Sequence, residues 1–410
     1  MELKRSEGIV MQLYDMVIIG GGPAGLSAAY YLTANNIKVC LFDRGQHYTK
    51  RLNKATPFDI ANGLGGAGLL YDGKYSFSPS GSYFWQNVDP QIAERSYEVV
   101  KKFGSCSGIN FPEWKEEWMS PQTISEGEKY YETMYFSQES QLNLVRYLSE
   151  QPFKISLNTE VSSVKKMKDG YIIETADGSE IFTHGVLIAT GKHGTCLLSH
   201  EDFTYDKSFK LEVGIRVECD TLAFIPKNNR AVDYKLIKRI DEKTHVRTFC
   251  CCKEGKVLSS FSGKYPSVNG EKVLDYNRSN VGILLRTEAE QGVYADEIQQ
   301  LLQNKKPLFK MSLIDFLSYQ SVIIGKSSDK AIKDFVGAIV DLSRHETLES
   351  AIIHGPEIEY IGDYPVFDSA TLKIPNESIW VAGDVSGKYR GLLVALVSGV
   401  YAAQNILGRS

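Results

Sequence analysis

The stretch that decides the fold runs from residue 16 to residue 43 and reads MVIIGGGPAGLSAAYYLTANNIKVCLFD. Its apolar start, Met16 to Ile19, is typical of a strand buried on both faces of a parallel sheet. A helical stretch from Leu26 to Ala34 follows, and then a second apolar run from Ile37 to Phe42. This order of strand, helix and strand predicts a βαβ unit at the start of an α/β domain.

The turn between the first strand and the helix has the spacing G-x-G-x-x-G, from Gly20 to Gly25. In this pattern Gly20 permits a tight turn, Gly22 lets a pyrophosphate approach the backbone, and Gly25 lets the helix pack closely on the strand. The helix N-terminus offers free N–H groups and a positive dipole end to phosphates. Asp43 stands where an acidic side chain accepts hydrogen bonds from a ribose. The stretch therefore predicts dinucleotide binding.

Length and composition narrow the class of protein. A chain of 410 residues can form two or three domains, and a formal net charge of −4 gives no basic field for nucleic acid. Seven cysteines without a C-x-x-C pair favour a reducing cytoplasm over a disulfide framework. The uncharged run from Met16 to Ile37 is long enough for a membrane span, but Gly20 to Pro23 would break such a helix, so we expect no membrane insertion.

A second glycine-rich stretch reads NGLGGAGLLYDGK, from Asn62 to Lys74. Gly63, Gly65 and Gly68 repeat the dinucleotide spacing, but no apolar strand precedes them and no helical pattern follows. We therefore expect a loop that lies against the cofactor; a merely flexible loop is the alternative.

The rest of the chain indicates how the domains are arranged. An aromatic-rich stretch, residues 83–135, shows no clear period and predicts an irregular insertion, while short strands between residues 153 and 188 predict a β-meander. Strict alternation from residue 211 to residue 218 predicts a half-buried antiparallel strand, and Lys310 to Tyr319 predicts a helix. We expect a Rossmann-like α/β domain over 14–205 and 356–410, with a mainly antiparallel α+β substrate domain inserted at 206–355.

Three features together resemble the two-dinucleotide-binding-domain flavoproteins: the fingerprint with Asp43, the turn Ala189-Thr190-Gly191, and Ala382-Gly383-Asp384 before a C-terminal helix. The resemblance implies FAD as the cofactor. It also implies that Asp384 hydrogen-bonds the ribityl chain, that the last helix directs its N-terminus at the flavin pyrimidine, and that Glu160-Val161 binds adenine through backbone groups.

Four motifs as a set resemble a bacterial and archaeal family of uncharacterised FAD-dependent dehydrogenases: NGLGGAGLLYDGK, LEVGIRVE, VRTFC-x-C and AGDVSGKYRGLLVALVSGVYAA. The resemblance covers most of residues 14–407. The chain departs from the family at residues 250–255, which read CCCKEG where the family usually has C-x-C-P-G-G, and at residues 383–387, which read GDVSG in place of G-E-G-A-G. The family implies FAD and names no substrate.

Motifs and resemblance together give one set of expected cofactor-binding residues. They are Gly20, Gly22, Pro23, Ala24, Gly25, Asp43, Arg44, Gly65, Gly66, Ala67, Gly68, Lys74, Val161, Ala189, Thr190, Gly191, Gly383, Asp384, Gly391 and Leu392.

Candidates for substrate chemistry are Arg216, Cys250, Cys252 and His193. Arg216 shares a strand face with Gly214, whose missing side chain could leave room for an anionic substrate; a surface ion pair is the equal alternative. Cys250 and Cys252 are expected on one strand face, in packing and substrate contact rather than dithiol chemistry. His193 is a candidate general acid or base. The histidines show no metal-ligand spacing, so the sequence predicts no metal site.

These residues predict an FAD-dependent oxidoreductase that passes a hydride or electrons between the flavin and an unidentified small substrate, which can be anionic. NAD(P)H is expected as a transient donor. Two alternatives stay open: a flavin-binding scaffold without turnover, and an RNA-modifying flavoprotein. The RNA would bind to Lys50, Arg51, Lys54 and the stretch from Lys235 to Arg247, although the overall charge makes nucleic acid the weaker partner.

Overall fold

The computed structural model divides into two compact units. Unit 1 consists of residues 1–121, 134–206 and 363–410, and unit 2 of residues 122–133 and 207–362. Within them the structure describes residues 2–4, 10–53, 56–71, 73–120, 127–193, 197–199, 203–206, 210–220, 232–262, 265–273, 276–288, 292–318, 322–341, 350–360 and 364–409. The domain limits drawn from the sequence, 14–205, 206–355 and 356–410, stay a prediction.

Unit 1 is built on a sheet whose strands pair in the order β6–β3–β2–β9–β8–β7. Strands β6, β3, β2 and β9 are parallel, β20 pairs parallel to the end of β9, and β7, β8 and β9 form an antiparallel meander. The strands are β1 Glu2–Lys4, β2 Val10–Ile19, β3 Val39–Phe42, β6 Lys154–Ser156, β7 Val161–Met167, β8 Gly170–Thr175, β9 Glu180–Ile188 and β20 Ile379–Val381.

Helices and short segments complete unit 1. The helices are α1 Pro23–Ala34, α2 Tyr48–Asn53, α3 Pro57–Ala61, α4 Gly66–Tyr71, α5 Ser82–Asn87, α6 Pro90–Ser105, α7 Gln138–Ser149 and α11 Leu392–Ile406. Short strands are β4 Lys74–Ser76, β10 Tyr205–Asp206 and β19 Tyr364–Pro365, and 3-10 turns are η1 Glu116–Met119, η2 Gly191–His193 and η5 Gly383–Ser386.

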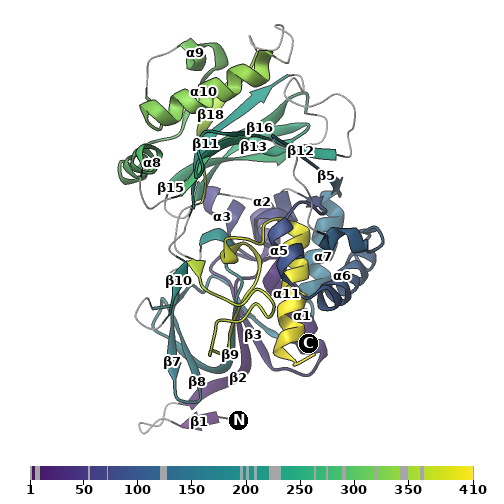
Figure 1. Ribbon diagram of the computed structural model, residues 1–410. Helices are drawn as coiled ribbons and strands as arrows, with labels where there is room; N and C mark the ends of the chain where they lie inside the picture. Colours follow the sequence, from purple (N-terminus) through teal and green to yellow (C-terminus); the bar gives the residue numbers. More distant parts are fainter. Residues whose placement is uncertain are drawn as a thin grey trace. The chain divides into compact units, whose positions relative to one another are not determined.

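Helices α1 and α11 run side by side, although they come from opposite ends of the chain (Figure 1). A Cβ added to Gly399 would overlap the carbonyl oxygen of Ala24 and the hydroxyl of Ser27, so only glycine permits this approach. The Ser27 hydroxyl donates to the carbonyl of Leu396 over 2.9 Å. The C-terminal helix therefore covers the first βαβ unit by backbone-to-backbone packing.

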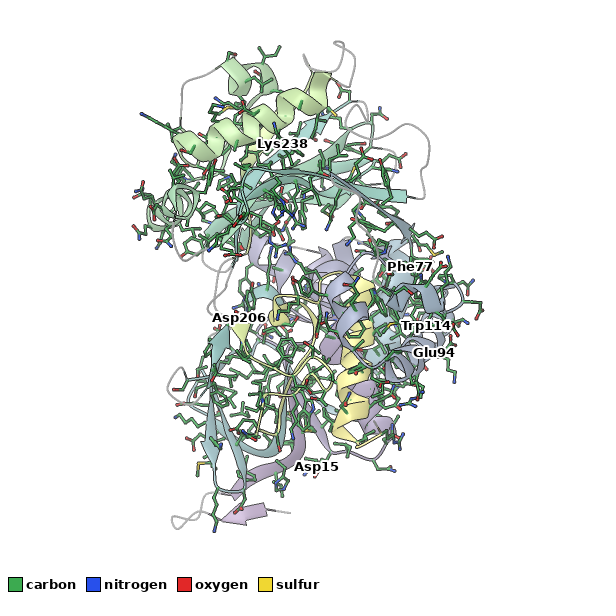
Figure 2. The ribbon with its side chains drawn as sticks, viewed as in Figure 1. Asp15, Phe77, Glu94, Trp114, Asp206 and Lys238 are labelled. Carbon is green, nitrogen blue, oxygen red and sulfur yellow. The ribbon has the colours of Figure 1, made fainter. Side chains whose placement is uncertain are left out.

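The aromatic-rich stretch is more regular than the sequence predicts. Residues 90–105 form the helix α6, which is capped by Asp89 and buries residues such as Tyr97 and Phe103. Trp114 packs on Trp118 with ring centroids 5.4 Å apart, and Phe77 lies 5.5 Å from Trp118 (Figure 2 labels Phe77 and Trp114). The expected irregular insertion over residues 83–135 is wrong for this part, because its amphipathic helix is hidden among aromatic residues that belong to the core.

Unit 2 contains an antiparallel sheet in the order β17–β18–β11–β16–β13–β12–β5. Its apolar face packs against three helices, and a hairpin of β14 and β15 accompanies the sheet. The elements are β5 Glu128–Tyr135, β11 Lys210–Cys219, β12 Val232–Arg239, β13 His245–Cys252, β14 Gly255–Ser262, β15 Tyr265–Lys272, β16 Ser279–Glu288, α8 Val293–Gln303, β17 Phe309–Ser312, α9 Leu313–Ser318, α10 Lys326–Asp341 and β18 Ile352–Tyr360.

The predicted fold class, a Rossmann-like α/β domain with a mainly antiparallel α+β part, is confirmed. Two local predictions differ from the structure. The expected helix at Lys310 to Tyr319 is confirmed over Leu313–Ser318 as α9, but its first residues belong to the strand β17. The polar face of β11 is buried. In both cases tertiary pairing outweighs local pattern.

We predict that Gly399→Ala lowers the free energy of unfolding of unit 1 by about 1–3 kcal/mol, the usual cost of overpacking. Helix propensity alone would favour alanine by about 1 kcal/mol, so a net loss reports the contact with Ala24. All 4 tryptophans lie in unit 1, so denaturant unfolding followed by tryptophan fluorescence measures the effect.

The control variant is Gly22→Ala. Gly22 has an extended backbone that alanine adopts, and the nearest described atom to an added Cβ is 3.8 Å away. Because Gly22 is the N-cap of α1, where alanine is less favourable than glycine, the variant should lose no more than about 1 kcal/mol of unfolding free energy. Equal stability of Gly399→Ala and the wild type would contradict the packing account.

Candidate functional site

The first glycine turn uses its three glycines for two different purposes. A Cβ on Gly20 would overlap the carbonyl of Ala189, and a Cβ on Gly25 would overlap the carbonyl of Gly20, so both are required by packing within the protein. Gly22 has φ −79° and ψ −173°, and no described atom lies closer than 3.8 Å to an added Cβ. Neither conformation nor packing within the described residues requires glycine there. This is the position at which the fingerprint expects a pyrophosphate.

The N-terminus of α1 is available to a ligand. Gly22 is its N-cap and offers no side-chain cap, Pro23 occupies the first helical position, and no acidic residue lies in the first turn. Ala24 is buried against Gly383, whose added Cβ would lie 3.2 Å from the Ala24 Cβ. The free N–H groups and the positive dipole end of α1 thus border the open space at Gly22.

Asp43 links the end of β3 to the glycine turn. Its Oδ2 accepts from the N–H of Gly21 over 2.7 Å, and its Oδ1 accepts from the N–H of Gly45 over 2.8 Å. A carboxylate has about four lone-pair sites, so two remain for further donors such as ribose hydroxyls. The carboxylate therefore fixes the turn and is positioned to bind a ribose as well.

Arg44 and Val161 continue the site beyond Asp43. The Nε of Arg44 donates to the Oδ1 of Asn62 over 2.7 Å, and its Nη1 lies 3.5 Å from the Oε1 of Glu160. Val161 begins β7, is 6% exposed, and stands next to a register irregularity in the β7–β8 pairing. The structure brings Glu160–Val161 to the Arg44 side of the glycine turn, where the resemblance expects adenine.

The second glycine run packs on the first. The N–H of Gly65 donates to the carbonyl of Gly21 over 2.8 Å, and an added Cβ on Gly66 would lie 3.0 Å from the Cα of Gly22. An added Cβ on Gly68 would overlap the side chain of Leu392 in α11. The second glycine run is thus held against the first turn, and the merely flexible loop does not fit these contacts. That the run lies against a cofactor stays a prediction.

Ala67 and Lys74 are the remaining expected cofactor residues of this run. Ala67 lies inside α4, which follows Gly65 directly although the sequence predicts no helix there. Lys74 is 6% exposed in β4, and its Nζ lies 6.0 Å from the ring centroid of Tyr135. Both stay predictions as cofactor contacts.

The turn after β9 contains an unsatisfied polar group. Ala189 donates its N–H to the carbonyl of Ile19 over 2.8 Å, which places the turn against Gly20. The Thr190 hydroxyl is buried and, within the described part of the chain, has no hydrogen-bond partner. Gly191 has φ +64° and faces open space. A buried hydroxyl without a partner costs about 1–3 kcal/mol, which a ligand atom would offset.

The segment before α11 supplies the last part of the site. Arg390 donates from its Nε to the Oδ1 of Asp384 over 3.2 Å, so the carboxylate is held in place and remains partly exposed. Gly391 is the N-cap of α11 with φ +102°, no side-chain cap, and no acidic residue in the first turn. A second free helix N-terminus therefore stands beside an oriented carboxylate.

A series of contacts connects these groups within unit 1. Arg44 contacts Glu160, which precedes Val161, and Asp43 contacts Gly21. The two glycine runs contact each other, and an added Cβ on Gly68 would overlap Leu392 beside Gly391. The structure thus brings together many of the expected cofactor residues, and two free helix N-termini with the space at Gly22 fit a dinucleotide.

The structure does not support Arg216 as a residue that binds an anionic substrate. Its guanidinium is 1% exposed, its Nη2 lies 2.6 Å from the Oε1 of Glu357, and its Nη1 donates to the Oδ1 of Asn280 and the carbonyl of Cys250. Burial raises the pKa of the Glu357 carboxyl, while the Arg216 cation opposes this shift and favours the carboxylate. Protein groups therefore occupy the guanidinium. The alternative of a surface ion pair does not fit either, because the Arg216–Glu357 pair is buried.

Gly214 also has a structural purpose. A Cβ there would overlap the carbonyl of Ile283 in the neighbouring strand β16. The missing side chain is required by close strand approach and leaves no gap for a substrate, so this part of the expectation is wrong.

A β-bulge interrupts the strand at Cys250. The pairing of β13 with β16 shifts register between Phe249 and Cys252, and Cys250 has φ +39°. Both thiols interact electrostatically with the Arg216 guanidinium, while Cys251 between them packs in the apolar core of unit 2, so a shared face of Cys250 and Cys252 stays the expectation. Cys250 is half-buried and Cys252 buried. Whether they contact substrate stays a prediction.

The expectations for His193, for a metal site and for a membrane span can be compared only with the described residues. His193 ends η2, but its side chain lies outside the described part, so its role as acid or base stays a prediction. No described group of three or more His, Cys, Asp or Glu residues could hold a metal ion. No described helix is long and apolar enough to cross a membrane.

Arg51 does not fit the RNA-binding alternative. Its side chain is 0% exposed and donates to backbone carbonyls. Arg247, at the end of the second basic stretch, forms an ion pair with the buried Glu212. Lys54 lies outside the described residues. Two of the expected RNA-binding cations are therefore engaged within the protein.

A family model described as an NAD(P)-binding Rossmann-like domain matches residues 18–60. The matched stretch contains the glycine turn, α1, β3 and α2. Unit 1 is a Rossmann-like nucleotide-binding domain.

Known proteins resemble the chain over different lengths. Ferredoxin–NADP reductase 1 of Bacillus cereus is 22% identical over 402 residues, 97% of this chain and 82% of that protein. Thioredoxin reductase of Bacillus subtilis is 29% identical over 94 residues, 23% of each chain. A solved structure, glycine oxidase from Geobacillus kaustophilus, covers 97% of this chain and 95% of its own, with 13% identity and a TM-score of 0.46. Over nearly its whole length the chain is therefore similar to a reductase.

We predict that Arg216→Met destabilises unit 2 by about 3–5 kcal/mol, because it leaves the Glu357 carboxyl buried without its cation. The double variant Arg216→Met/Glu357→Leu should recover most of this loss, since both charges are removed. Hydrogen exchange of the β11 and β16 amides measures the effect, because no tryptophan lies in unit 2. A single variant with wild-type protection would show that the ion pair does not support the sheet.

Proposed function

We propose that this protein is an FAD-dependent oxidoreductase that passes a hydride or electrons between the flavin and a small substrate, which can be anionic. The observation that carries the proposal is Gly22. Packing requires Gly20 and Gly25, whereas no close contact among the described residues requires glycine at position 22, and a bound pyrophosphate explains the open space there. The free N-termini of α1 and α11 and the unpartnered Thr190 hydroxyl support the same conclusion.

The residues of unit 1 have distinct tasks in this proposal. Gly22 and the N-terminus of α1 hold the pyrophosphate, Asp43 binds the adenosine ribose, and the backbone at Val161 binds adenine. Asp384, oriented by Arg390, binds the ribityl chain.

The N-terminus of α11 favours negative charge at the flavin end. FAD supplies the oxidation–reduction chemistry when it is bound, while the chain supplies position and charge.

NAD(P)H is the proposed electron donor. Two similar proteins, a ferredoxin–NADP reductase and a thioredoxin reductase, are named as reductases. The second glycine run follows α3 rather than a strand, and its helix α4 has 6 residues, so it lacks the parts of a separate dinucleotide fold. We therefore propose that NAD(P)H binds only transiently. Membership of the family of uncharacterised FAD-dependent dehydrogenases, and a place in the cytoplasm, are proposed on the sequence motifs and the cysteine usage.

We predict that the purified protein carries non-covalent FAD and that Gly22→Val abolishes its binding, because the side chain fills the space of the pyrophosphate. Heat release followed by chromatography identifies the cofactor, and titration of the apo-protein gives the dissociation constant. Gly22→Ala should weaken binding less than Gly22→Val, since the smaller side chain fills less of the space.

Stability in the absence of FAD serves as the control: both Gly22 variants should fold and lose only about 1 kcal/mol, because alanine and valine cap the helix α1 less well than glycine. Wild-type protein without FAD after reconstitution, or Gly22→Val with wild-type affinity, would refute the proposal.

We also predict that replacing both Cys250 and Cys252 by serine leaves anaerobic flavin reduction by NADPH within about tenfold, a barrier change of about 1.4 kcal/mol. The half-buried Cys250 at a bulge suits packing or substrate contact more than electron exchange. Stopped-flow bleaching of the flavin measures the rate. A loss of several orders of magnitude with FAD still bound would instead reveal dithiol chemistry.

A further inference from the structure

Arg51 lies in α2, and its side chain is 0% exposed. Its Nε donates to the carbonyl of Asp59 over 2.9 Å, and its Nη1 to the carbonyl of Leu64 over 2.7 Å. Its Nη2 donates to the carbonyl of Gly66 over 2.9 Å and lies 3.4 Å from that of Ile60. The buried guanidinium thus binds carbonyl oxygens from four residues between positions 59 and 66.

One peptide group connects this cation to the first glycine turn. The carbonyl of Leu64 accepts from Arg51, while the N–H of Gly65, in the same peptide plane, donates to the carbonyl of Gly21 over 2.8 Å. A trans peptide directs its C=O and N–H to opposite sides. When Arg51 orients the carbonyl, it therefore also orients the N–H that joins the two glycine runs.

Gly66 is held in the same way. Its carbonyl accepts from Arg51, and an added Cβ would lie 3.0 Å from the Cα of Gly22. Gly63 must also be glycine, because an added Cβ would lie 2.7 Å from the Cδ of Arg51, and its φ is +109°. Arg51 therefore sets the separation of Gly66 from Gly22, which borders the open space of the first turn.

Lysine could not replace this arrangement. An arginine carries five N–H donors on three nitrogens in a rigid plane and stays charged when buried, whereas the lysine donors share one nitrogen. Three separate carbonyl directions need three separate donor atoms. The fixed positive charge also has the sign that attracts a diphosphate.

We propose that Arg51 is the positioning residue of the pyrophosphate site: it holds the second glycine run against Gly22 and so fixes the width of the space that receives the diphosphate of FAD. This inference rests on the proposed function. The cation acts through the backbone of the second glycine run and does not itself contact the cofactor.

The test compares Arg51→Lys with the wild type and with Leu148→Ala, a truncation at a fully buried position in α7 that lowers stability while keeping Arg51. Hydrogen exchange of the peptide covering 62–66 is measured without FAD, and the FAD dissociation constant by titration. Arg51→Lys should exchange this peptide faster and bind FAD at least tenfold more weakly. Leu148→Ala should melt earlier by tryptophan fluorescence yet keep the wild-type dissociation constant.

A second variant, Gly66→Ala, narrows the same space while keeping Arg51, and it should also weaken FAD binding at least tenfold. Should Arg51→Lys not fold, wild-type affinity in Gly66→Ala overturns the inference. Arg51→Lys with FAD affinity within threefold of wild type, or with unchanged exchange of residues 62–66, overturns it as well. If the wild type itself binds no FAD while Arg51→Lys still raises the hydrogen-exchange rate of residues 62–66, the proposed function is wrong. The role of Arg51 in fixing the second glycine run is then still supported.

Discussion

The contact between Gly25 and the carbonyl of Gly20 is the constraint on which unit 1 depends. It lets α1 start directly above the end of β2, which leaves the helix N-terminus free beside the turn. α1 is then close enough for α11 to pack on it through Gly399. Because these contacts are made by backbone atoms, no rearrangement of side chains can replace them. The position of the free N-termini of both helices follows from them.

The local part of this arrangement could be predicted from the sequence. The glycine spacing, the apolar strands and Asp43 lie within one βαβ unit, whose geometry is set by near neighbours in the chain. The meander could also be predicted, since its turns are marked by glycine and aspartate. The C-terminal strand and helix are harder to place in the fold, because their partners β9 and α1 lie far away in the chain.

The parts that failed depend on distant partners. A sequence does not show that Arg51 meets the carbonyls of a later loop, or that Arg216 meets Glu357 across a strand pair. Both arginines therefore look like surface or ligand-binding cations in the sequence. The bulge at Cys250 is likewise invisible, because it follows from the pairing of β13 with β16. Buried charge is decided by tertiary structure, and pattern analysis assumes that charge is exposed.

The position of β20 and α11 after unit 2 in the sequence also orders the events of biosynthesis. β20 completes the parallel sheet beside β9, and α11 covers α1, so unit 1 lacks both until residues 379–406 leave the ribosome. Unit 2 consists mostly of the continuous stretch 207–362, which emerges earlier. At a synthesis rate of about 5–20 residues per second, the inserted unit has several seconds to fold before its host domain can close. The nascent chain must keep the apolar strands of unit 1 from aggregating during that interval.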